Sequence, residues 1–303
     1  MLFLLIACSS EDESMRSYPQ DPHIRISDAQ VWGTHNSYHL VSENNVIDIW
    51  DYSHKPLAEQ LDRGIRQFEI DIVYNPEEEE ILVQHVPFID DGSTCYRFRD
   101  CLQIMKDWST QHPWHFPLQI LIEPKDEVAT WSVIEHLDTV DAQIIDIWGE
   151  QLWSPRLQQG DFPELRDSII NSGWPTLEVL RGKAIFVLLD KGDVRSVYTS
   201  GDSGVFDRAM FPLFAFEHEM ATYFLGDDPF DPEIESWVSN GFLVRTRGEV
   251  DLVFDPVRLE QAFDSGAHSI SVDTEESLER IDPLHPIRCN PKVASSCRAD
   301  DLE

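Results

Sequence analysis

Strand-like segments alternate with helical stretches along most of this chain of 303 residues. The alternation constrains the fold strongly, because parallel strands need long crossover connections, which are usually helices. We therefore predict a parallel α/β fold with eight strand segments. The segments, rich in apolar or β-branched residues, are 30–33, 67–73, 81–84, 117–122, 184–189, 213–216, 242–246 and 269–272.

One connection breaks this pattern. The link at 74–81 is too short for a helix, so the barrel is expected to be irregular there. The chain shows no linker, repeat or low-complexity tract, and a single α/β barrel can reach this length. We therefore expect one barrel domain at residues 23–303. The helical stretches are 56–63, 98–111, 128–148, 232–239 and 256–265.

Four oxygen-bearing side chains lie on or just after three of the strand-like segments. Glu69 and Asp71 are two residues apart, so on a strand they point to the same face and can hold one hard cation. Asn36 and Glu123 would complete an all-oxygen shell of the kind that calcium accepts. The sequence thus predicts a calcium site formed by these four residues.

Two histidines accompany the predicted ligands. His35 adjoins Asn36, and His85 follows another strand-like segment. Asn36, His85, Asp71 and Glu123 fall at or just beyond the C-terminal ends of their segments, where barrel enzymes build active sites. Each residue alone is more often a surface or structural group, but together they favour a metal-assisted phosphodiesterase.

The order and spacing of these motifs resemble the X region of the phosphatidylinositol-specific phospholipase C superfamily. The pattern runs His35-Asn36, then Glu69-x-Asp71, then a second histidine, then a strand that ends in glutamate. The small, secreted, calcium-dependent bacterial branch is the most similar. The likeness extends over residues 24–273 and includes the later runs 181–183, 241–247 and 265–267.

The resemblance implies a distorted TIM barrel, a calcium cofactor and hydrolysis of an inositol phospholipid or a related phosphodiester. In such a reaction the inositol 2-hydroxyl attacks phosphorus and gives a cyclic phosphodiester that water can open. One histidine must protonate the departing oxygen while the other stabilises phosphoryl charge or helps to remove a proton. We expect His85 to be the general acid and His35 the second partner. Glu69 and Glu123 are competing candidates for the base.

Several basic residues are candidates for contacts with phosphate or sugar hydroxyls. Lys125 follows Glu123 by two residues, so a continuing strand would aim both side chains to one side. Lys183 begins a later segment, and Arg245 and Arg247 end another. A surface or structural salt bridge is an equally good interpretation of each. Asp273, at the end of the last segment, is a candidate to hold another site residue in place without contacting the substrate itself.

The net charge of -33 restricts the partners of the chain. Nucleic acid is excluded as a partner, because phosphate backbones are bound by excess lysine and arginine. Adsorption to anionic lipid through charge alone is also disfavoured. We expect a monomer that acts on a phosphodiester, with an inositol phospholipid head group as the expected substrate.

The first residues contain a short apolar run that ends at Cys8. The run is too short to span a bilayer and lacks the basic start of a full signal peptide. The sequence Leu5-Ile6-Ala7-Cys8 resembles the lipobox of bacterial lipoproteins, in which the cysteine is lipidated. We interpret residues 1–22 as a truncated signal and tether, and we expect an exported protein, either a cell-envelope lipoprotein anchored to the membrane or a secreted one.

Four cysteines remain, and export would place them in an oxidising compartment. Four cysteines allow three pairings, and the short separations favour Cys95 with Cys101 and Cys289 with Cys297. Each disulfide would contribute about 2–3 kcal/mol on the chain-entropy estimate. A zinc site or buried free thiols are the alternatives, although neither pair has the tight spacing that structural zinc favours.

Three other functions remain open from the sequence. A glycerophosphodiester phosphodiesterase shares the barrel, the Glu-x-Asp pair and a metal, but its usual His-Arg-Gly start is replaced here by His35-Asn36-Ser37. A noncatalytic calcium-dependent lipid or glycan binding module would need the oxygen ligands but not both histidines. A lipid-anchored structural protein would need neither.

Overall fold

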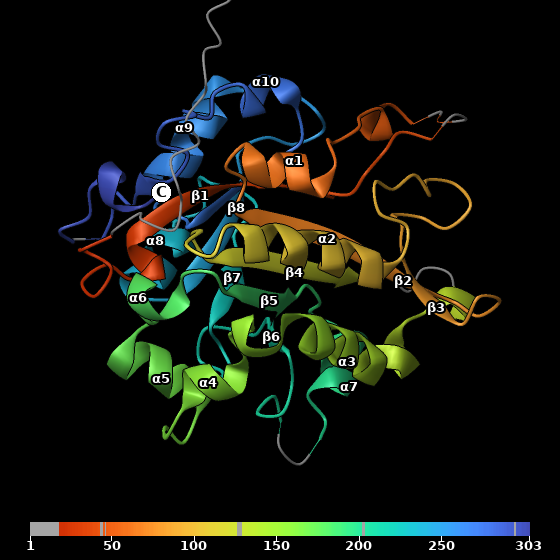
Figure 1. Ribbon diagram of the computed structural model, residues 1–303, viewed down its shortest axis with the longest axis horizontal. Coiled ribbons are helices and arrows are strands. Elements are labelled where there is room, and N and C mark those ends of the chain that lie inside the picture. The colour runs from red at the N-terminus through yellow and green to blue at the C-terminus, as the bar shows by residue number, and fades with distance from the viewer. Residues whose placement is uncertain (1–17, 43–44, 46, 126–128, 202–203, 294) are drawn as a thin grey trace, which may run out of the picture.

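The computed structural model describes residues 18–303 except 43–44, 46, 126–128, 202–203 and 294. The predicted lipobox with Cys8 therefore lies outside the described residues. A sheet of parallel strands stands at the centre, and helices cover its outer face (Figure 1). None of the helices in the described part of the chain has the length and apolarity that a bilayer span requires.

Eight parallel strands form the central sheet in the order β6-β5-β4-β2-β1-β9-β8-β7. A single bridge between Leu213 and Tyr223 joins the two ends of this order, so the sheet is a nearly closed, distorted TIM barrel. This confirms the predicted fold class. The strands are β1 Ala29–Thr34, β2 Gln67–Asn75, β4 Leu118–Pro124, β5 Ala184–Leu188, β6 Met210–Pro212, β7 Tyr223–Leu225, β8 Leu243–Arg247 and β9 Ser269–Val272.

Two of the predicted strands differ from the structure. The segment 81–84 becomes β3 Glu80–Val83, which pairs antiparallel with β2 as a hairpin and is not a barrel strand. The short link before it has room only for a turn, as an antiparallel pair requires. The segment 213–216 lies just after β6, and β7 was not predicted. Both β6 and β7 have only three residues, too few to show a strand pattern.

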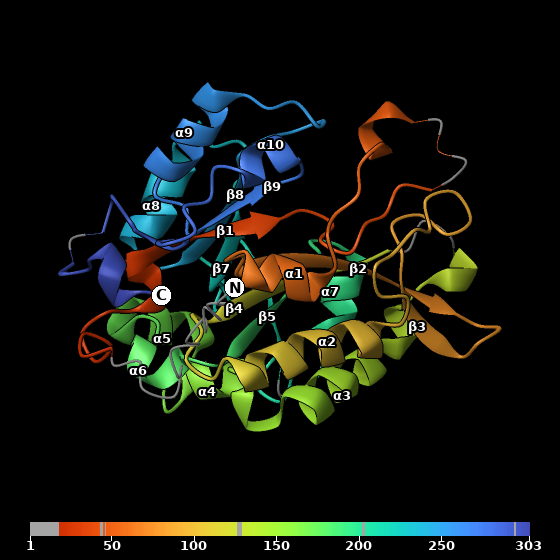
Figure 2. The ribbon, with the colours of Figure 1, turned by 45° about the horizontal axis from the view of Figure 1, so that its top comes forward.

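Alternation along the strands separates the outer core from the barrel interior. On β2, Phe68, Ile70 and Ile72 belong to the apolar cluster beneath the helices, whereas Glu69 and Asp71 between them point inward. Figure 2 shows α2 and α3 side by side along this wall. The helices are α1 Leu57–Asp62, α2 Phe98–Gln111, α3 Leu137–Trp148, α4 Pro155–Gln159, α5 Leu165–Ser172, α6 Leu177–Leu180, α7 Asp193–Tyr198, α8 Glu233–Ser239, α9 Pro256–Asp264 and α10 Glu275–Leu278.

The predicted helices agree with the structure except at one start. The stretch 98–111 coincides with α2, and α1, α8 and α9 differ from their predicted stretches by one residue at the ends. In the described part of the predicted stretch 128–148, α3 begins at Leu137, and 3-10 turns at Ala129–Trp131 and Ile134–His136 precede it. The intervening Thr-Trp-Ser-Val run consists of weaker helix formers, which explains the delayed start.

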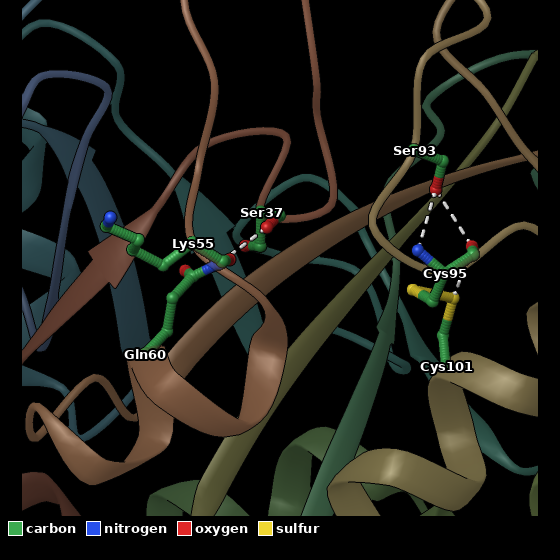
Figure 3. Close-up of a disulfide and its surroundings, with 6 residues drawn as sticks. All are labelled: Ser37, Lys55, Gln60, Ser93, Cys95 and Cys101. Atoms are coloured by element: carbon green, nitrogen blue, oxygen red, sulfur yellow. Dashed lines mark hydrogen bonds between the residues drawn. A yellow bond between two sulfur atoms is a disulfide. The ribbon is translucent and has the colours of Figure 1, made fainter.

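Both expected disulfides are present. Cys95 is bonded to Cys101 with 5.2 Å between their Cα atoms, and Cys289 to Cys297 with 5.8 Å. The first disulfide ties the loop before α2 to the second turn of that helix (Figure 3). The second closes a loop that begins at the short strand β10 Arg288–Cys289, which pairs antiparallel with β1.

Candidate active site

The register of β2 and β4 brings three carboxylates together at the carboxyl end of the barrel. Asp71 is paired with Glu123 across the two strands, and Glu69 lies on the same face of β2 as Asp71. Each of the three offers an oxygen within 4.8 Å of the others. Glu69 and Asp71 are buried and Glu123 is half-buried. Like charges held this close repel each other, so the cluster favours a bound cation.

Lys125 partly balances this negative charge. Its Nζ lies 3.0 Å from Asp71 Oδ2 and 2.7 Å from Glu123 Oε1. Burial raises the pKa of Asp71 well above its usual range, and Lys125 opposes that shift. Burial disfavours the charge on Lys125, but Asp71 and Glu123 outweigh it and raise the pKa of the ammonium. Lys125 therefore lies inside the carboxylate cluster as a fixed positive charge.

Asn36 supplies the fourth predicted ligand. It follows β1 in a left-handed conformation with φ 45°, which asparagine tolerates better than most residues. The amide of Ser37 donates to the Glu69 carbonyl at 2.9 Å, so Asn36 lies beside β2. The Asn36 Oδ1 atom is buried without a hydrogen-bond partner, and so is Asp71 Oδ1, the oxygen of that carboxylate that does not face Lys125. Unsatisfied buried oxygens beside clustered carboxylates fit a calcium ion.

His35 is oriented by Asp273. Its Nδ1 donates to Asp273 Oδ1 at 2.8 Å, and its Nε2 lies 3.5 Å from Glu69 Oε1. Burial would raise the pKa of Asp273, but His35 and Arg247 outweigh it and lower that pKa to about 2. Asp273 is therefore an anion that fixes the proton of His35 on Nδ1. The other nitrogen of His35 is left facing the carboxylate cluster.

His85 reaches the site by way of the β2–β3 hairpin. Val83 on β3 is paired with Ile72 on β2, so the chain has already returned to the level of the carboxylate cluster two residues before His85. His85 Nδ1 donates to Asp90 Oδ2 at 2.8 Å. The predicted position at the end of a barrel strand is therefore replaced by a hairpin end at the same barrel mouth.

Asp90 is shared with a second, fully buried histidine. His39 Nε2 lies 2.9 Å from Asp90 Oδ1, and His39 Nδ1 lies 2.9 Å from the carbonyl of Tyr52. Burial would raise the pKa of Asp90, but hydrogen bonds from His39 and His85 outweigh it and lower the pKa. Asp90 therefore accepts from two histidines and holds the proton of His85 on Nδ1, which leaves Nε2 free.

Both histidines line the same hollow. A cavity of about 180 Å³ is bordered by His35, Asn36, His85 and Asp273. His35 also borders a larger neighbouring cavity of about 370 Å³, whose wall includes the carboxylates of Glu69 and Glu123. A substrate in these hollows would thus meet the two histidines and the oxygen cluster at once.

Two arginines of β8 hold other members of the site. Arg245 NH2 donates to Glu69 Oε2 at 2.6 Å, and because β1 and β9 separate their strands this contact crosses the barrel interior. Burial opposes the charge of Arg245, but Glu69 and Asp227 outweigh it and raise its pKa. Arg247 pairs with Asp273 and borders both cavities. Arg245 also borders the larger cavity, with its guanidinium held by Glu69 and Asp227, whereas Arg247 borders both cavities.

The structure does not bring Lys183 to this cluster. Lys183 precedes β5, at the amino end of the barrel, and its Nζ donates to the Glu150 carbonyl at 2.8 Å. Lys191, three residues beyond the end of β5, lines the larger cavity instead. Sequence reasoning missed Lys191, although its place after a predicted strand was a usable signal. It also missed Asp90 and His39, for which the sequence offers no spacing signal.

A family of known proteins matches nearly the whole described chain. The sequence model described as "Phosphoinositide phospholipase C, Ca2+-dependent" matches residues 24–80 and 77–291. No curated protein matches the chain in sequence.

Solved structures with the same fold include three bacterial enzymes. The Ca²⁺-dependent phosphatidylinositol-specific phospholipase C of Streptomyces antibioticus superposes with a TM-score of 0.64 at 19% identity, covering 84% of this chain and 96% of that one. The calcium-dependent enzyme of a Pseudomonas species gives 0.62 at 15% identity, covering 84% and 91%. The phosphatidylinositol-specific enzyme of Listeria monocytogenes gives 0.50 at 13% identity, covering 85% and 93%. These likenesses agree with the distorted barrel.

Proposed function

The chain belongs to the Ca²⁺-dependent phosphoinositide phospholipase C family and is a phosphodiesterase, and we propose that it cleaves an inositol phospholipid through a cyclic phosphate. One observation carries this proposal. Two histidines, each held at Nδ1 by a buried carboxylate, border one hollow beside an oxygen cluster suited to calcium. A binding module would need the oxygen cluster but not this pair.

Asn36, Glu69, Asp71 and Glu123 are the residues that would hold calcium. A bound calcium ion would neutralise phosphoryl charge and lower the pKa of a nearby hydroxyl. Lys125 and Arg245 already hold the carboxylates of this cluster in place. Arg247 and Lys191 border the larger cavity and are suited to contact the phosphate.

The two histidines divide the proton transfers. Each has its Nδ1 occupied by a carboxylate, so Nε2 is the nitrogen that can exchange a proton with substrate. His35 Nε2 faces the carboxylate cluster, and we assign His35 to the side of the attacking 2-hydroxyl. We assign His85, on the hairpin side of the hollow, as the general acid that protonates the departing oxygen. Glu69 and Glu123 are alternative bases. A substrate with a better leaving group separates the roles of the two histidines, because it depends less on the general acid.

Exposed apolar side chains around the barrel mouth favour a lipid substrate over a soluble diester. Phe88 is 73% exposed, Ile89 59%, Val253 62% and Ile49 49%. These residues lie on loops that follow β3, β8 and β1, and Ile49 also borders the hollow that His35 and His85 share. Bulky apolar side chains exposed beside a catalytic hollow suit a membrane surface. Because the chain carries a net charge of -33, contact through these side chains is more favourable than contact through charge.

The substrate test compares three diesters. Phosphatidylinositol, glycerophosphoinositol and glycerophosphocholine are incubated with the protein in calcium and then with a chelator, and phosphorus NMR identifies the products. We expect calcium-dependent cleavage of phosphatidylinositol with inositol cyclic phosphate among the products. Full turnover without metal, or preferential cleavage of glycerophosphocholine, would overturn the proposal in favour of other diesterase chemistry.

The calcium ligands are tested independently of turnover. Alanine at Asn36, Glu69, Asp71 or Glu123 should abolish calcium binding in titration calorimetry while circular dichroism shows a retained fold. Lys183→Ala is a matched control, because Lys183 lies at the opposite end of the barrel and should leave calcium binding unchanged.

Export is part of the same proposal. The two disulfides suit an oxidising compartment. If Cys8 is lipidated, Cys8→Ser should release the protein from the membrane fraction of expressing cells. Retention of the Cys8→Ser protein on that fraction would remove the lipid anchor from the proposal.

A further inference from the structure

A second hollow lies at the amino end of the barrel, away from the carboxylate cluster. It has a volume of about 610 Å³, and Arg280, Arg288 and Arg298 are among its walls. Arg288 lies on β10 and is paired with Gln30 near the start of β1, whereas His35 follows the other end of that strand. The helices α9 and α10 lie on the same side of the barrel as β1 and β9 (Figure 2). This hollow is separate from the site at the barrel mouth.

The charge of this hollow is the reverse of the rest of the chain. The sequence has 56 acidic and 23 basic residues, and most arginines of the described chain are in ion pairs. Among the described residues, no carboxylate lies within 4.0 Å of the guanidinium of Arg280, Arg288 or Arg298, and none of the three donates a side-chain hydrogen bond. Three unpaired arginines around one hollow in so acidic a protein leave their N–H groups available to an anion.

Two acidic residues near these arginines contact a histidine instead. His285, which also borders the hollow, places Nε2 2.9 Å from Asp300 Oδ1 and Nδ1 3.5 Å from Asp282 Oδ2. Both carboxylates therefore contact the histidine and not the arginines. Asp282 also borders the hollow, so its wall carries three arginines against one carboxylate and keeps a net positive charge.

Two of these three exposed arginines are also stacked on aromatic rings before any ligand arrives. The guanidinium of Arg280 lies 4.3 Å from the ring centroid of Phe254, and that of Arg288 lies 4.3 Å from that of Phe263. Such stacking fixes the plane of a guanidinium and leaves its N–H edge free. Ordering these side chains on binding therefore costs less than ordering free surface arginines.

The second disulfide holds two of the arginines near each other. Arg288 directly precedes Cys289 and Arg298 directly follows Cys297, and the Cα atoms of the bonded cysteines are 5.8 Å apart. Without the disulfide, the loop between the two arginines would be free to open. The disulfide and the side-chain stacking therefore both hold the arginines of this site in place.

We propose that this hollow binds a soluble multivalent oxyanion of the phosphate or sulfate type through Arg280, Arg288 and Arg298. Guanidinium groups match the paired oxygens of such anions with two parallel hydrogen bonds. An anion with two charged groups can engage two of the arginines together. The strongly negative surface elsewhere would repel the same anion. At the barrel mouth, the calcium-free cluster of Glu69, Asp71 and Glu123 would disfavour it despite Arg247 and Lys191 nearby.

The test uses inorganic pyrophosphate and calcium-free protein. Calorimetry measures affinity, and ¹⁵N NMR of the arginine Nε–H groups identifies the residues that respond. We expect saturable binding that weakens with added salt, with shifts at Arg280, Arg288 and Arg298. The double variant Arg288→Gln with Arg298→Gln should bind at least about tenfold more weakly, since two charge-assisted bonds are lost.

A matched control removes the same charge elsewhere. Arg63 and Arg99 are ion-paired with Glu275 and Asp146, and Arg63→Gln with Arg99→Gln should leave pyrophosphate affinity within about twofold. Equal weakening by both double variants would reduce the effect to net charge and overturn the site. Absence of pyrophosphate binding to the unmodified protein would overturn it as well.

The disulfide and the source of the anion are tested in two further arms. Cys289→Ser with Cys297→Ser should weaken pyrophosphate binding several-fold and leave phosphatidylinositol turnover unchanged, because the catalytic hollow is at the other end of the barrel. Vesicles of phosphatidylcholine with phosphatidylglycerol should not retain the protein through these arginines. Arginine-dependent retention on such vesicles without pyrophosphate binding would overturn the soluble ligand in favour of a lipid headgroup.

Discussion

The two histidine–carboxylate pairs at the barrel mouth have the same contact between Nδ1 and a carboxylate but lie on different parts of the fold. His35 Nδ1 is 2.8 Å from Asp273, and His85 Nδ1 is 2.8 Å from Asp90. In each pair another side chain that can carry positive charge also binds the carboxylate, Arg247 in the first and a buried histidine in the second. The pairs differ in what positions them.

The first pair belongs to the barrel wall. His35 follows β1 and Asp273 follows β9, and the pairing of Thr34 with Val272 places the two residues at the same level. Glu249, fully buried, accepts hydrogen bonds from the backbone amides of Asp273 and Thr274 and holds the turn after β9. The geometry of this pair is therefore fixed by the same hydrogen bonds that hold the sheet.

The second pair belongs to a loop. His85 and Asp90 are five residues apart, and two backbone bonds between Val86 and Asp90 close the turn between them. His39 and the Cys95–Cys101 disulfide connect this loop to its surroundings. A pair built on a loop therefore depends on a few local contacts, which can be removed without unfolding the barrel.

The largest expected effect comes from removing each histidine. His85→Ala should slow turnover of phosphatidylinositol by roughly 10²–10⁴-fold, the usual effect of one positioned acid or base. An activated aryl ester of inositol phosphate needs little protonation of its leaving group, so His85→Ala should recover much of its rate on that substrate. His35→Ala should show a similar loss on both substrates, because its proposed role is on the attacking side.

Calorimetry of calcium binding is the control for both variants, which should keep near-normal affinity. Equal losses of both variants on both substrates would contradict the division of roles. An unimpaired His85→Ala protein would remove His85 from the mechanism.

A pH experiment probes what supports the barrel-built pair. His54 is buried beneath it, its Nε2 donates to the His35 carbonyl at 2.9 Å, and burial lowers the pKa of His54 to about 4. Between pH 6.5 and about 4 the unfolded chain binds a proton that the folded chain does not. The contribution to stability is therefore present above pH 6.5 and lost as the pH falls, by about 3 kcal/mol in total.

Urea unfolding at several pH values measures this loss. His54→Gln keeps a donor for the His35 carbonyl but cannot titrate, so its free energy of unfolding should fall less steeply than that of the unmodified protein from pH 6.5 to 4. His115 and His268 have the same lowered pKa and remain in both proteins, so the difference between the two curves isolates His54. Parallel curves would show that His54 does not contribute.

Replacing each carboxylate by its amide tests how much the support of each histidine–carboxylate pair contributes to activity and to stability. Asp273→Asn and Asp90→Asn should each reduce turnover by about 10–100-fold, because the amide can hold the wrong tautomer of its histidine. We expect Asp273→Asn also to lower the free energy of unfolding, since Arg247 loses its partner within the barrel wall. Asp90→Asn should leave global unfolding nearly unchanged, and a large loss of stability there would contradict the idea of a locally built pair.

Much of the fold was predictable because long elements carry a clear pattern. The 14 residues of α2 have enough turns for the apolar stripe to show, and β2 and β4 are long enough to show strand character. The three-residue strands β6 and β7 have no such pattern, and only pairing with their neighbours defines them. The hairpin strand β3 looked like a barrel strand because sequence character does not reveal strand direction.

The site was predictable where sequence spacing determines position. The two-residue spacing of Glu69 and Asp71 fixes a shared face, and Glu123 and Asp273 follow from their place at strand ends. Asp90 could not be predicted, because its contacts with two histidines arise only when separate loops fold together. Lys183 lies away from the cluster because it precedes its strand, and strand direction then puts it at the opposite end of the barrel.

The smallest expected effect comes from the disulfide beside the loop-built pair. Cys95 and Cys101 join the end of the loop that carries Asp90 to α2, and Ser93 hydrogen-bonds both the amide and the carbonyl of Cys95 (Figure 3). Cys95→Ser with Cys101→Ser should lower the free energy of unfolding by about 2 kcal/mol, as expected for a loop this short. Turnover should fall a few-fold because the loop becomes freer to move. Removing Cys289 and Cys297 is the matched control, with a similar loss of stability and no loss of turnover, and equal losses of turnover would show that the disulfide near His85 acts only through global stability.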